Sequence, residues 1–292
     1  MIGDAILAAI EARLARAGAV PDDGFRRFVA GGVTVGVIDD RRVERLARFD
    51  CFDVSRGAVS LDARLATQDA RTKAMADVAA TLRSEGALPA WRDEAYAVAG
   101  AFGETPLFLI ERGAARYFGV VTYAAHVNGI IRDGATTMMW LAKRSHNKAV
   151  DPGLLDNLVG GGIAATLRVD QTVVKEAWEE AGIPASLARC AQPAGLVCSR
   201  RPMFDGLQRE VLFVHDLTLP VDFVPQNQDG EAIEHRLVTL EDAARTIAVD
   251  TGDNEVTVES SLAVLDYLIR QGEIRPDQPH YVRLAGLLHQ HL

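Results

Sequence analysis

Apolar residues recur every three or four positions near both ends of the chain, and this spacing predicts amphipathic helices. Four apolar residues near the N-terminus share one helical face: Ile6, Leu7, Ile10 and Leu14. Gly18 follows them and is expected to end the helix, as glycine commonly does. The same spacing predicts helices near the C-terminus over residues 240–248, 256–270 and 281–292.

Alternating apolar and polar residues predict β-strands in the middle of the chain. Residues 118–127 and 137–144 are expected to pair as a hairpin, because Asp133-Gly134 between them favours a tight turn. Further short strands are expected over residues 194–198, 210–219 and 236–238. Residues 199–206 are expected to form a loop between two of them.

The first third of the chain mixes both kinds of spacing and predicts an α+β module. Its expected elements are a strand over 33–37, a helix over 41–49, two short strands within 51–61, a helix over 68–82 and an apolar run over 106–110. The pattern turns strand-rich near residue 117. We therefore predict an N-terminal α+β module (residues 1–115) and a second domain (residues 116–292), each long enough to bury its own core.

Residues 158–184 combine a glycine turn, a loop and a short helix with one acidic face. Three carboxylates fall within an arc of roughly 100° on this helix: Glu176, Glu179 and Glu180. Asp170 is expected to cap the helix, and Gly182 followed by Pro184 is expected to end it. Crowded carboxylates repel one another, and a divalent cation such as Mg²⁺, which prefers oxygen ligands, would relieve the repulsion. A solvated acidic face is the alternative interpretation.

This stretch resembles the signature of the Nudix hydrolases, G-x5-E-x7-R-E-U-x-E-E-x-G-U, in which U is aliphatic. Gly161 opens the box, the three glutamates occupy their positions, and Gly182 and Ile183 close it. Leu167 stands where the first glutamate belongs, and Lys175 replaces the arginine. The resemblance implies a Nudix fold, in which a mixed β-sheet lies between helices as an α/β/α sandwich. It also implies hydrolysis of a diphosphate bond with Mg²⁺, or alternatively Mn²⁺, as cofactor.

A wider resemblance rests on four segments: WRDEAYAV, HVNGIIRDG, LDNLVGGGI and VVKEAWEEAGIP. They are similar to the Nudix group related to the first half of fungal thiamine pyrophosphokinases. That group carries an additional N-terminal region, uses K-E in place of R-E and tolerates loss of the first glutamate. The resemblance covers residues 25–243 approximately and implies a diphosphatase that acts on thiamine diphosphate and its oxidised forms.

The resemblance also implies roles for individual residues. The expected metal ligands are Glu176, Glu179, Glu180 and the carbonyl oxygen of Gly160. The base that activates water would be Glu176 or a downstream loop glutamate, for which Glu231 is the first candidate and Glu234 the second. Lys175 would steady the helix carboxylates, and we expect it to reach Glu179 one turn on, while Leu167 packs the loop by apolar contact.

Basic residues on both sides of the box are candidates for binding the substrate diphosphate. Lys143 and Arg144 begin a basic loop directly ahead of the glycine turn, and Arg200 and Arg201 lie after the box. For the loop that begins at Lys143, a solvated connection is the alternative, and the segment with Arg200 and Arg201 could clamp a ligand.

The net charge argues against two classes of partner. A net charge of −9 disfavours nucleic acid or an anionic membrane surface as the main partner. A small-molecule diphosphate is the partner that the family resemblance implies. Cys51, Cys190 and Cys198 are too few and too irregular for a disulfide framework, which indicates a reducing compartment. Without a secretory signal pattern, a cytoplasmic protein is expected.

Two other functions stay open from the sequence. The same chemistry could act on another nucleoside diphosphate derivative such as ADP-ribose. Alternatively, the changes at Leu167 and Lys175 could mark a Nudix-fold binding module without turnover, although retention of all three box glutamates weighs against it.

Overall fold

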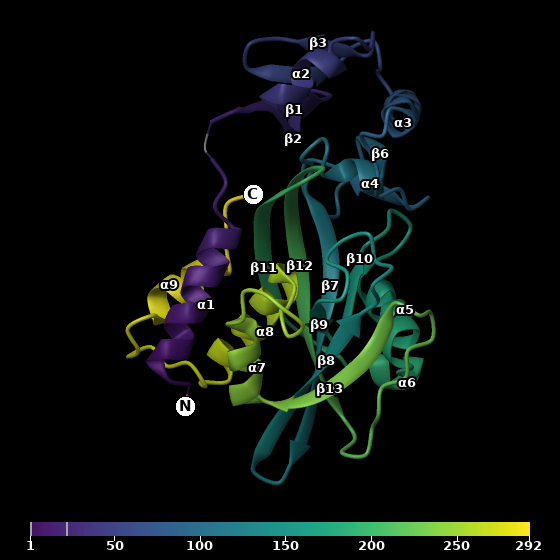
Figure 1. Cartoon of the computed structure of the whole chain (residues 1–292). Coiled ribbons are helices and arrows are strands. Elements are labelled where there is room, and N and C mark those ends of the chain that lie inside the picture. The colour runs from purple at the N-terminus through teal and green to yellow at the C-terminus, as the bar shows by residue number, and fades with distance from the viewer. Residues whose placement is uncertain (1, 22) are drawn as a thin grey trace.

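The computed structural model describes residues 2–21 and 23–292 and contains two packed regions (Figure 1). The larger region is a β-sheet with helices on both faces, and we call it the sandwich (residues 2–17 with 122–292). The smaller region, which we call the N-terminal module (residues 25–121), lies at one end of that sheet. In the part of the chain that the structure describes, no helix is long and apolar enough to cross a lipid bilayer.

Seven strands form one mixed sheet in the sandwich: β7 (Thr122–Asp133), β8 (Thr136–Arg144), β9 (Leu155–Asn157), β10 (Val159–Gly162), β11 (Gln192–Met203), β12 (Gly206–Leu219) and β13 (Ala232–Thr239). The strand order is β11-β12-β7-β8-β13, while β10 pairs with β7 and β9 pairs with β8. Strands β12 and β7 are parallel, and the other pairs are antiparallel.

Helices cover both faces of this sheet (Figure 1). One face is covered by α5 (Val169–Ala181) and α6 (Ala185–Ala188), and the other by α1 (Asp4–Ala17), α7 (Leu240–Ile247), α8 (Val258–Arg270) and α9 (Tyr281–Leu287). In β7, Ile130 is buried with the second group of helices and Ile131 with α5, because successive side chains of a strand point to opposite faces. The predicted α/β/α sandwich is confirmed.

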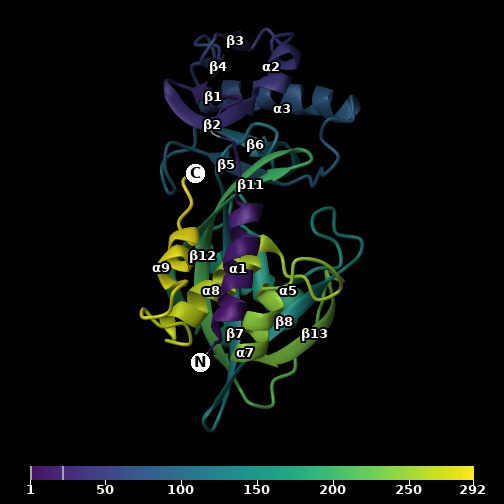
Figure 2. The ribbon, with the colours of Figure 1, turned by 60° about the vertical axis from the view of Figure 1, so that its left-hand side comes forward.

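Helix α1 packs against the C-terminal helices, although it is the first element of the chain (Figure 2). Its buried apolar face is the one predicted: Leu7, Ile10 and Leu14. Arg13 is buried on the same helix and donates to the carbonyl of Ile247 at 3.2 Å and to the hydroxyl of Ser261 at 2.9 Å. The domain boundary at residue 115 stays a prediction. Although α1 precedes that boundary in the chain, its buried side chains belong to the core of the sandwich.

The N-terminal module has a hydrophobic core of its own. Its elements are β1 (Phe25–Ala30), β2 (Val33–Asp39), α2 (Asp40–Leu46), β3 (Phe52–Val54), β4 (Ala58–Leu61), α3 (Gln68–Ser84), β5 (Ala95–Val98), β6 (Phe108–Glu111) and α4 (Arg112–Ala115). Strands β2-β1-β4-β3 form one sheet, and β5 pairs with β6 in another. Phe28 contacts Phe108 and Phe118 at ring-centroid distances of 6.0 and 5.4 Å, so aromatic packing joins the strands. The α+β module is therefore confirmed.

Several local predictions are wrong. The predicted hairpin forms at Asp133-Gly134, but β8 pairs with residues 129–133 and not with residues 118–127. The last helix ends at Leu287 and not at residue 292. Residues 199–206 are not a loop, because β11 continues to Met203 and joins β12 through a tight turn. The apolar alternation stops at Cys198, whereas the backbone pairing does not. Asp170 is not the N-cap of α5, since the cap is Arg168, and the Asp170 carboxylate pairs with the Arg168 guanidinium at 2.8 Å.

The packing of α1 predicts that Leu14→Ala lowers the free energy of unfolding by about 2–5 kcal/mol, because it leaves a cavity in the sandwich core. Denaturant titration followed by circular dichroism measures this change. Arg16→Ala is the control on the same helix, and loss of its exposed ion pair with Asp250 should cost less than about 1 kcal/mol. Equal effects of the two substitutions would contradict the buried position of α1.

Candidate active site

A polar cleft of about 410 Å³ lies where the N-terminal module meets β10 and α5. Charged side chains of both signs line it. Those of the sandwich include the carboxylates of Glu176, Glu179 and Glu231. Those of the module include the guanidinium groups of Arg92, Arg112 and Arg116.

Strand β10 has no side chains along the cleft, and this absence lets other groups approach its backbone. A Cβ atom at Gly161 would lie 2.3 Å from the carboxyl carbon of Glu176. At Gly162 it would lie 1.8 Å from the hydroxyl oxygen of Tyr96, which comes from β5 of the module. Glycine at these positions therefore allows Glu176 and Tyr96 to meet on one strand.

The carboxylates of Glu176 and Glu179 converge on one positive group. The Lys175 ammonium donates to Glu176 Oε1 at 2.9 Å and to Glu179 Oε2 at 2.7 Å. Although partial burial lowers the pKa of Lys175, the hydrogen bonds to Glu179 and Glu176 outweigh it and raise that pKa above its ordinary value. The predicted contact of Lys175 with Glu179 is confirmed. Two carboxylates that reach one ammonium are residues that would hold a divalent cation.

Glu180 lies beneath the strand. Its Oε2 accepts a hydrogen bond from the backbone N–H of Gly160 at 2.8 Å, and its side chain is buried. Burial, together with the negative charge of Asp156, raises the pKa of Glu180 well above the ordinary value of a glutamate. Within residues 2–21 and 23–292, no three His, Cys, Asp or Glu side chains are arranged as a ready metal site.

The two candidates for the downstream glutamate lie in different places. Glu231 lines the cleft and pairs with the ammonium of Lys148. Glu234 is held by Arg236 at 2.7 Å on an exposed strand edge and is not among the described residues that line the cleft. The geometry therefore keeps Glu231 as the candidate.

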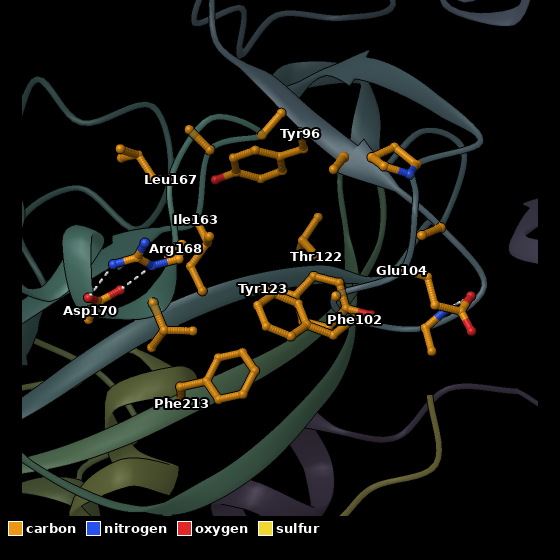
Figure 3. Close-up of a pocket in the computed structure, with 18 of the residues that line it drawn as sticks. Tyr96, Phe102, Glu104, Thr122, Tyr123, Ile163, Leu167, Arg168, Asp170 and Phe213 are labelled. Atoms are coloured by element: carbon orange, nitrogen blue, oxygen red, sulfur yellow. Dashed lines mark hydrogen bonds and ion pairs between the residues drawn. The ribbon is translucent and has the colours of Figure 1, made fainter. Parts of the chain in front are cut away.

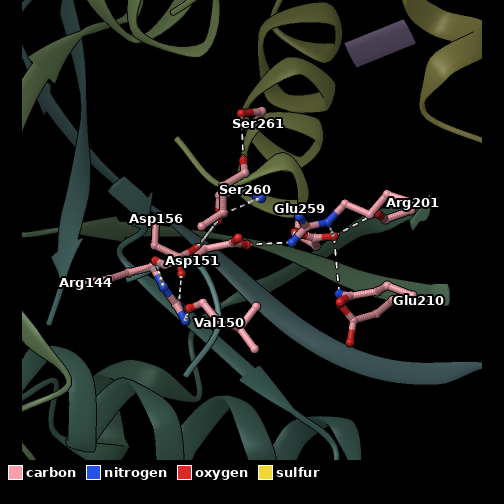
Figure 4. A network of polar contacts seen from close by, with 12 residues as sticks. Arg144, Val150, Asp151, Asp156, Arg201, Glu210, Glu259, Ser260 and Ser261 are labelled. Carbon is pink, nitrogen blue, oxygen red and sulfur yellow. Dashed lines mark hydrogen bonds and ion pairs between the residues drawn. The ribbon is translucent and has the colours of Figure 1, made fainter. Parts of the chain in front are cut away.

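The four basic residues expected to bind substrate are occupied by the protein itself or lie away from the cleft. Arg144 and Arg201 line the cleft but are paired, Arg144 with Asp156 and Arg201 with Asp151 and Glu259 (Figure 4). Two others are not among the described lining residues: Lys143, which is buried and donates to the carbonyl of Asp253, and Arg200.

The arginines of the module are not among the site residues predicted from the sequence. Arg112 is paired with Glu94 at 2.9 Å and Arg116 with Asp205 at 2.6 Å, whereas the Arg92 guanidinium has no ion pair with any described residue. Burial lowers the pKa of Arg92, and the neighbouring positive charges of Arg112, Arg144 and Arg116 lower it further. In the sequence, Trp91 to Glu94 could either touch a substrate or form a buried tryptophan flanked by surface charges, and the sequence alone favours the second interpretation.

Glu210 on β12 was missed as well. It lies in the cleft, accepts a hydrogen bond from the Thr122 hydroxyl at 3.1 Å, and has its pKa raised by burial and by Glu259. Because side chains alternate along a strand, Glu210 lies on the same face as the buried Leu212. An inward-facing carboxylate in a strand is the signal that could have identified it.

The close approach at Gly162 predicts a clash that a second substitution relieves. Gly162→Ala should lower the free energy of unfolding by about 1–3 kcal/mol, because the methyl group meets the Tyr96 hydroxyl. Adding Tyr96→Phe removes that hydroxyl and should restore part of the loss, as measured in thermal melts. Gly57→Ala, with open space around its Cβ position, is the control. If Gly162→Ala proves as harmless as this control, the contact is not as described.

Two family descriptions match this chain. A domain of unknown function (DUF4743) matches residues 8–122, and the NUDIX domain matches residues 122–257. The second match spans the box, the strands of the sheet and the start of the C-terminal helices.

Curated relatives cover most of the chain. Nudix hydrolase 24, chloroplastic, of Arabidopsis thaliana is 39% identical over 263 residues, which are 89% of this chain and 71% of the relative. Nudix hydrolase 20, chloroplastic, of the same plant is 36% identical over 270 residues, with the same shares. Uncharacterized protein YJR142W of Saccharomyces cerevisiae is 30% identical over 217 residues, 69% of this chain and 62% of the relative. With this similarity and the box geometry described above, the chain belongs to the Nudix hydrolase family and is a hydrolase of diphosphate bonds.

Proposed function

We propose that this protein is a Mg²⁺-dependent diphosphatase that hydrolyses thiamine diphosphate or its oxidised forms. The observation that carries the proposal is the composition of the cleft, where box carboxylates and module arginines line one space. A diphosphate is an anion with oxygens on every side. Arginine binds such oxygens directly, whereas carboxylates bind them only through a cation.

The residues of the box fit a hard divalent ion. Glu176 and Glu179 already place oxygen atoms within 2.9 Å of one cation, the Lys175 ammonium. Glu180 and the carbonyl oxygen of Gly160 are proposed as further ligands. When bound, Mg²⁺ would neutralise charge on the phosphate and make a water molecule more acidic. Mn²⁺ accepts similar oxygen ligands and would serve as a substitute.

Arg92 is the proposed phosphate-binding residue of the module. Its guanidinium has no ion-pair partner among the described residues and lies near three other positive groups, an arrangement that an anion would stabilise. Arg112 and Arg116 are oriented by Glu94 and Asp205 and add positive potential. The substrate diphosphate is proposed to lie between Arg92 and the box carboxylates.

Removal of a proton from the attacking water requires a base at the cleft, and the proposed base is a carboxylate. Glu231 and Glu176 are the two candidates. Glu231 is positioned by its ion pair with Lys148, and Glu176 lies against Gly161. Lys175 is proposed to position the carboxylates of Glu176 and Glu179 and to shield their mutual repulsion.

The choice of thiamine diphosphate rests on the four similar segments, each of which contributes at least one residue to the lining of the cleft. A screen of Mg²⁺-dependent product formation with thiamine diphosphate, its oxidised forms and ADP-ribose tests it. Preference for a thiamine compound supports the proposal. Turnover of ADP-ribose alone would favour the alternative substrate class, and binding of all three without turnover would indicate a binding module.

Metal dependence is the first expected outcome. Excess EDTA should abolish turnover, and added Mg²⁺ should restore it. Mg²⁺ should also raise the melting temperature of the wild type, because an ion that binds only the folded state stabilises it. Glu176→Gln should reduce this thermal shift. Full activity of metal-free protein in EDTA would refute the proposed mechanism.

Substitutions should separate the ligands from the lysine. Glu176→Gln should lower kcat by about 10² to 10⁴, because it removes a negative charge and a proposed base. Lys175→Ala should lower kcat much less, since its role is to position other groups. Glu241→Gln, which alters an exposed ion pair with Arg245, is the control and should leave kcat unchanged. Steady-state kinetics with Mg²⁺ measures all three variants. Near-normal rates for Glu176→Gln would support the alternative interpretation, in which the acidic face of the helix is a solvated surface without a catalytic role.

A further inference from the structure

A second pocket, of about 720 Å³, lies next to the polar cleft, and we call it the ring pocket (Figure 3). Tyr96 and Thr122 line both spaces, so one wall separates the two. The ring pocket is formed by residues 99–106 of the module, the sheet of the sandwich and the box loop. Its volume lies in the range of sites that bind small molecules.

Aromatic side chains from three segments form one side of the ring pocket. The ring of Phe102 lies 4.6 Å from that of Tyr123 and 4.8 Å from that of Phe213. Phe102 nevertheless remains 45% exposed, so a large apolar surface faces the pocket and solvent. Tyr96 lies on the opposite side in Figure 3, across an open space. Facing aromatic and aliphatic groups suit a flat ring.

The charged groups of the ring pocket disfavour an anion. Arg168 is already paired with Asp170 at 2.8 Å. Glu104 presents a carboxylate that accepts the N–H of Ala101 at 3.1 Å. Burial lowers the pKa of His215, which favours its neutral form. Of the described lining residues, none offers an unpaired arginine or lysine, so a neutral or cationic ring fits better than an anionic one.

We infer that the ring pocket holds the neutral or cationic heteroaromatic ring of the substrate and that the N-terminal module thereby selects the substrate. The inference rests on the proposed function, because it takes the diphosphate to lie in the polar cleft. Tyr96 and Thr122 would then lie between the diphosphate and the ring. The module supplies Arg92 for the phosphate and Phe102 for the ring. Each part of the substrate would then contact a different segment of the module.

Leu167 acquires a role in this arrangement. It lies at the box position where the family signature has a glutamate, and its side chain lines the ring pocket. A carboxylate there would stand in a mostly apolar space. The leucine therefore extends the apolar wall from the module to the box loop, which gives the departure from the signature a reason in ligand binding.

Ring binding can be tested apart from hydrolysis. Isothermal titration calorimetry would measure the dissociation constants of thiamine and adenosine, which carry a ring without a diphosphate, and of inorganic pyrophosphate with Mg²⁺, which has no ring. Phe102→Ala should weaken ring binding by roughly 2- to 10-fold, the range expected for one aromatic contact. Leu167→Glu should weaken binding of neutral adenosine as well. Neither substitution should change pyrophosphate binding by more than about twofold, since both residues lie outside the cleft.

Phe204→Ala is the matched control. Phe204 is 74% exposed in the turn between β11 and β12 and is not among the described residues that line either pocket, so Phe204→Ala should leave every dissociation constant unchanged. Ring binding by the wild type that Phe102→Ala and Leu167→Glu both leave unchanged would overturn the inference, as would failure of both ring compounds to bind. Phe102-dependent binding of adenosine but not thiamine would keep the inference and reject thiamine diphosphate as the substrate. Failure of thiamine diphosphate hydrolysis with Phe102-dependent ring binding would likewise reject only the proposed function.

Discussion

The cleft depends on strand β10, because its glycines carry no side chains that would cover the backbone. Three consecutive glycines in β10 let side chains from β7, α5 and β5 approach one strand, where Cβ atoms would lie 3.0 Å from His126, 2.3 Å from Glu176 and 1.8 Å from Tyr96. Directly after this strand, the N–H of Ala165 donates to the carbonyl of Ala95 in the module at 2.8 Å. The acidic helix, the sheet and the module therefore meet at a single place, and a side chain on β10 would separate them.

The second constraint is the way buried charge is compensated around the cleft (Figure 4). Arg144 neutralises Asp156, and Arg201 neutralises Glu259, which also accepts a hydrogen bond from Ser199 at 2.8 Å. Removing one partner of such a buried pair typically costs about 3–5 kcal/mol, because the other charge remains without compensation. These two arginines therefore compensate buried carboxylates of the fold, which is why Arg92 of the module is the residue proposed to contact an anionic substrate.

Features that depend on local spacing were predictable from the sequence, and features that join distant segments were not. The box helix α5 was predictable because the spacing of its side chains follows helix geometry, and Gly182 ends the helix in a left-handed conformation as expected. The extension of β11 was missed because Arg201 points to Glu259, 58 residues away, and gives no apolar alternation. The ring pocket was missed for the same reason, since Phe102, Tyr123 and Phe213 converge only in the folded chain.

The position of α1 has a consequence for how the module is attached. Because α1 is anchored among the C-terminal helices, the chain leaves the sandwich after residue 17 and returns to it at β7, so the module is an insertion with two tethers. A unit attached by a single flexible linker would sample a wide volume, which would lower the effective concentration of its side chains at the cleft. Two tethers confine it, so the effective concentration of Arg92 and Phe102 at their pockets stays high between one turnover and the next.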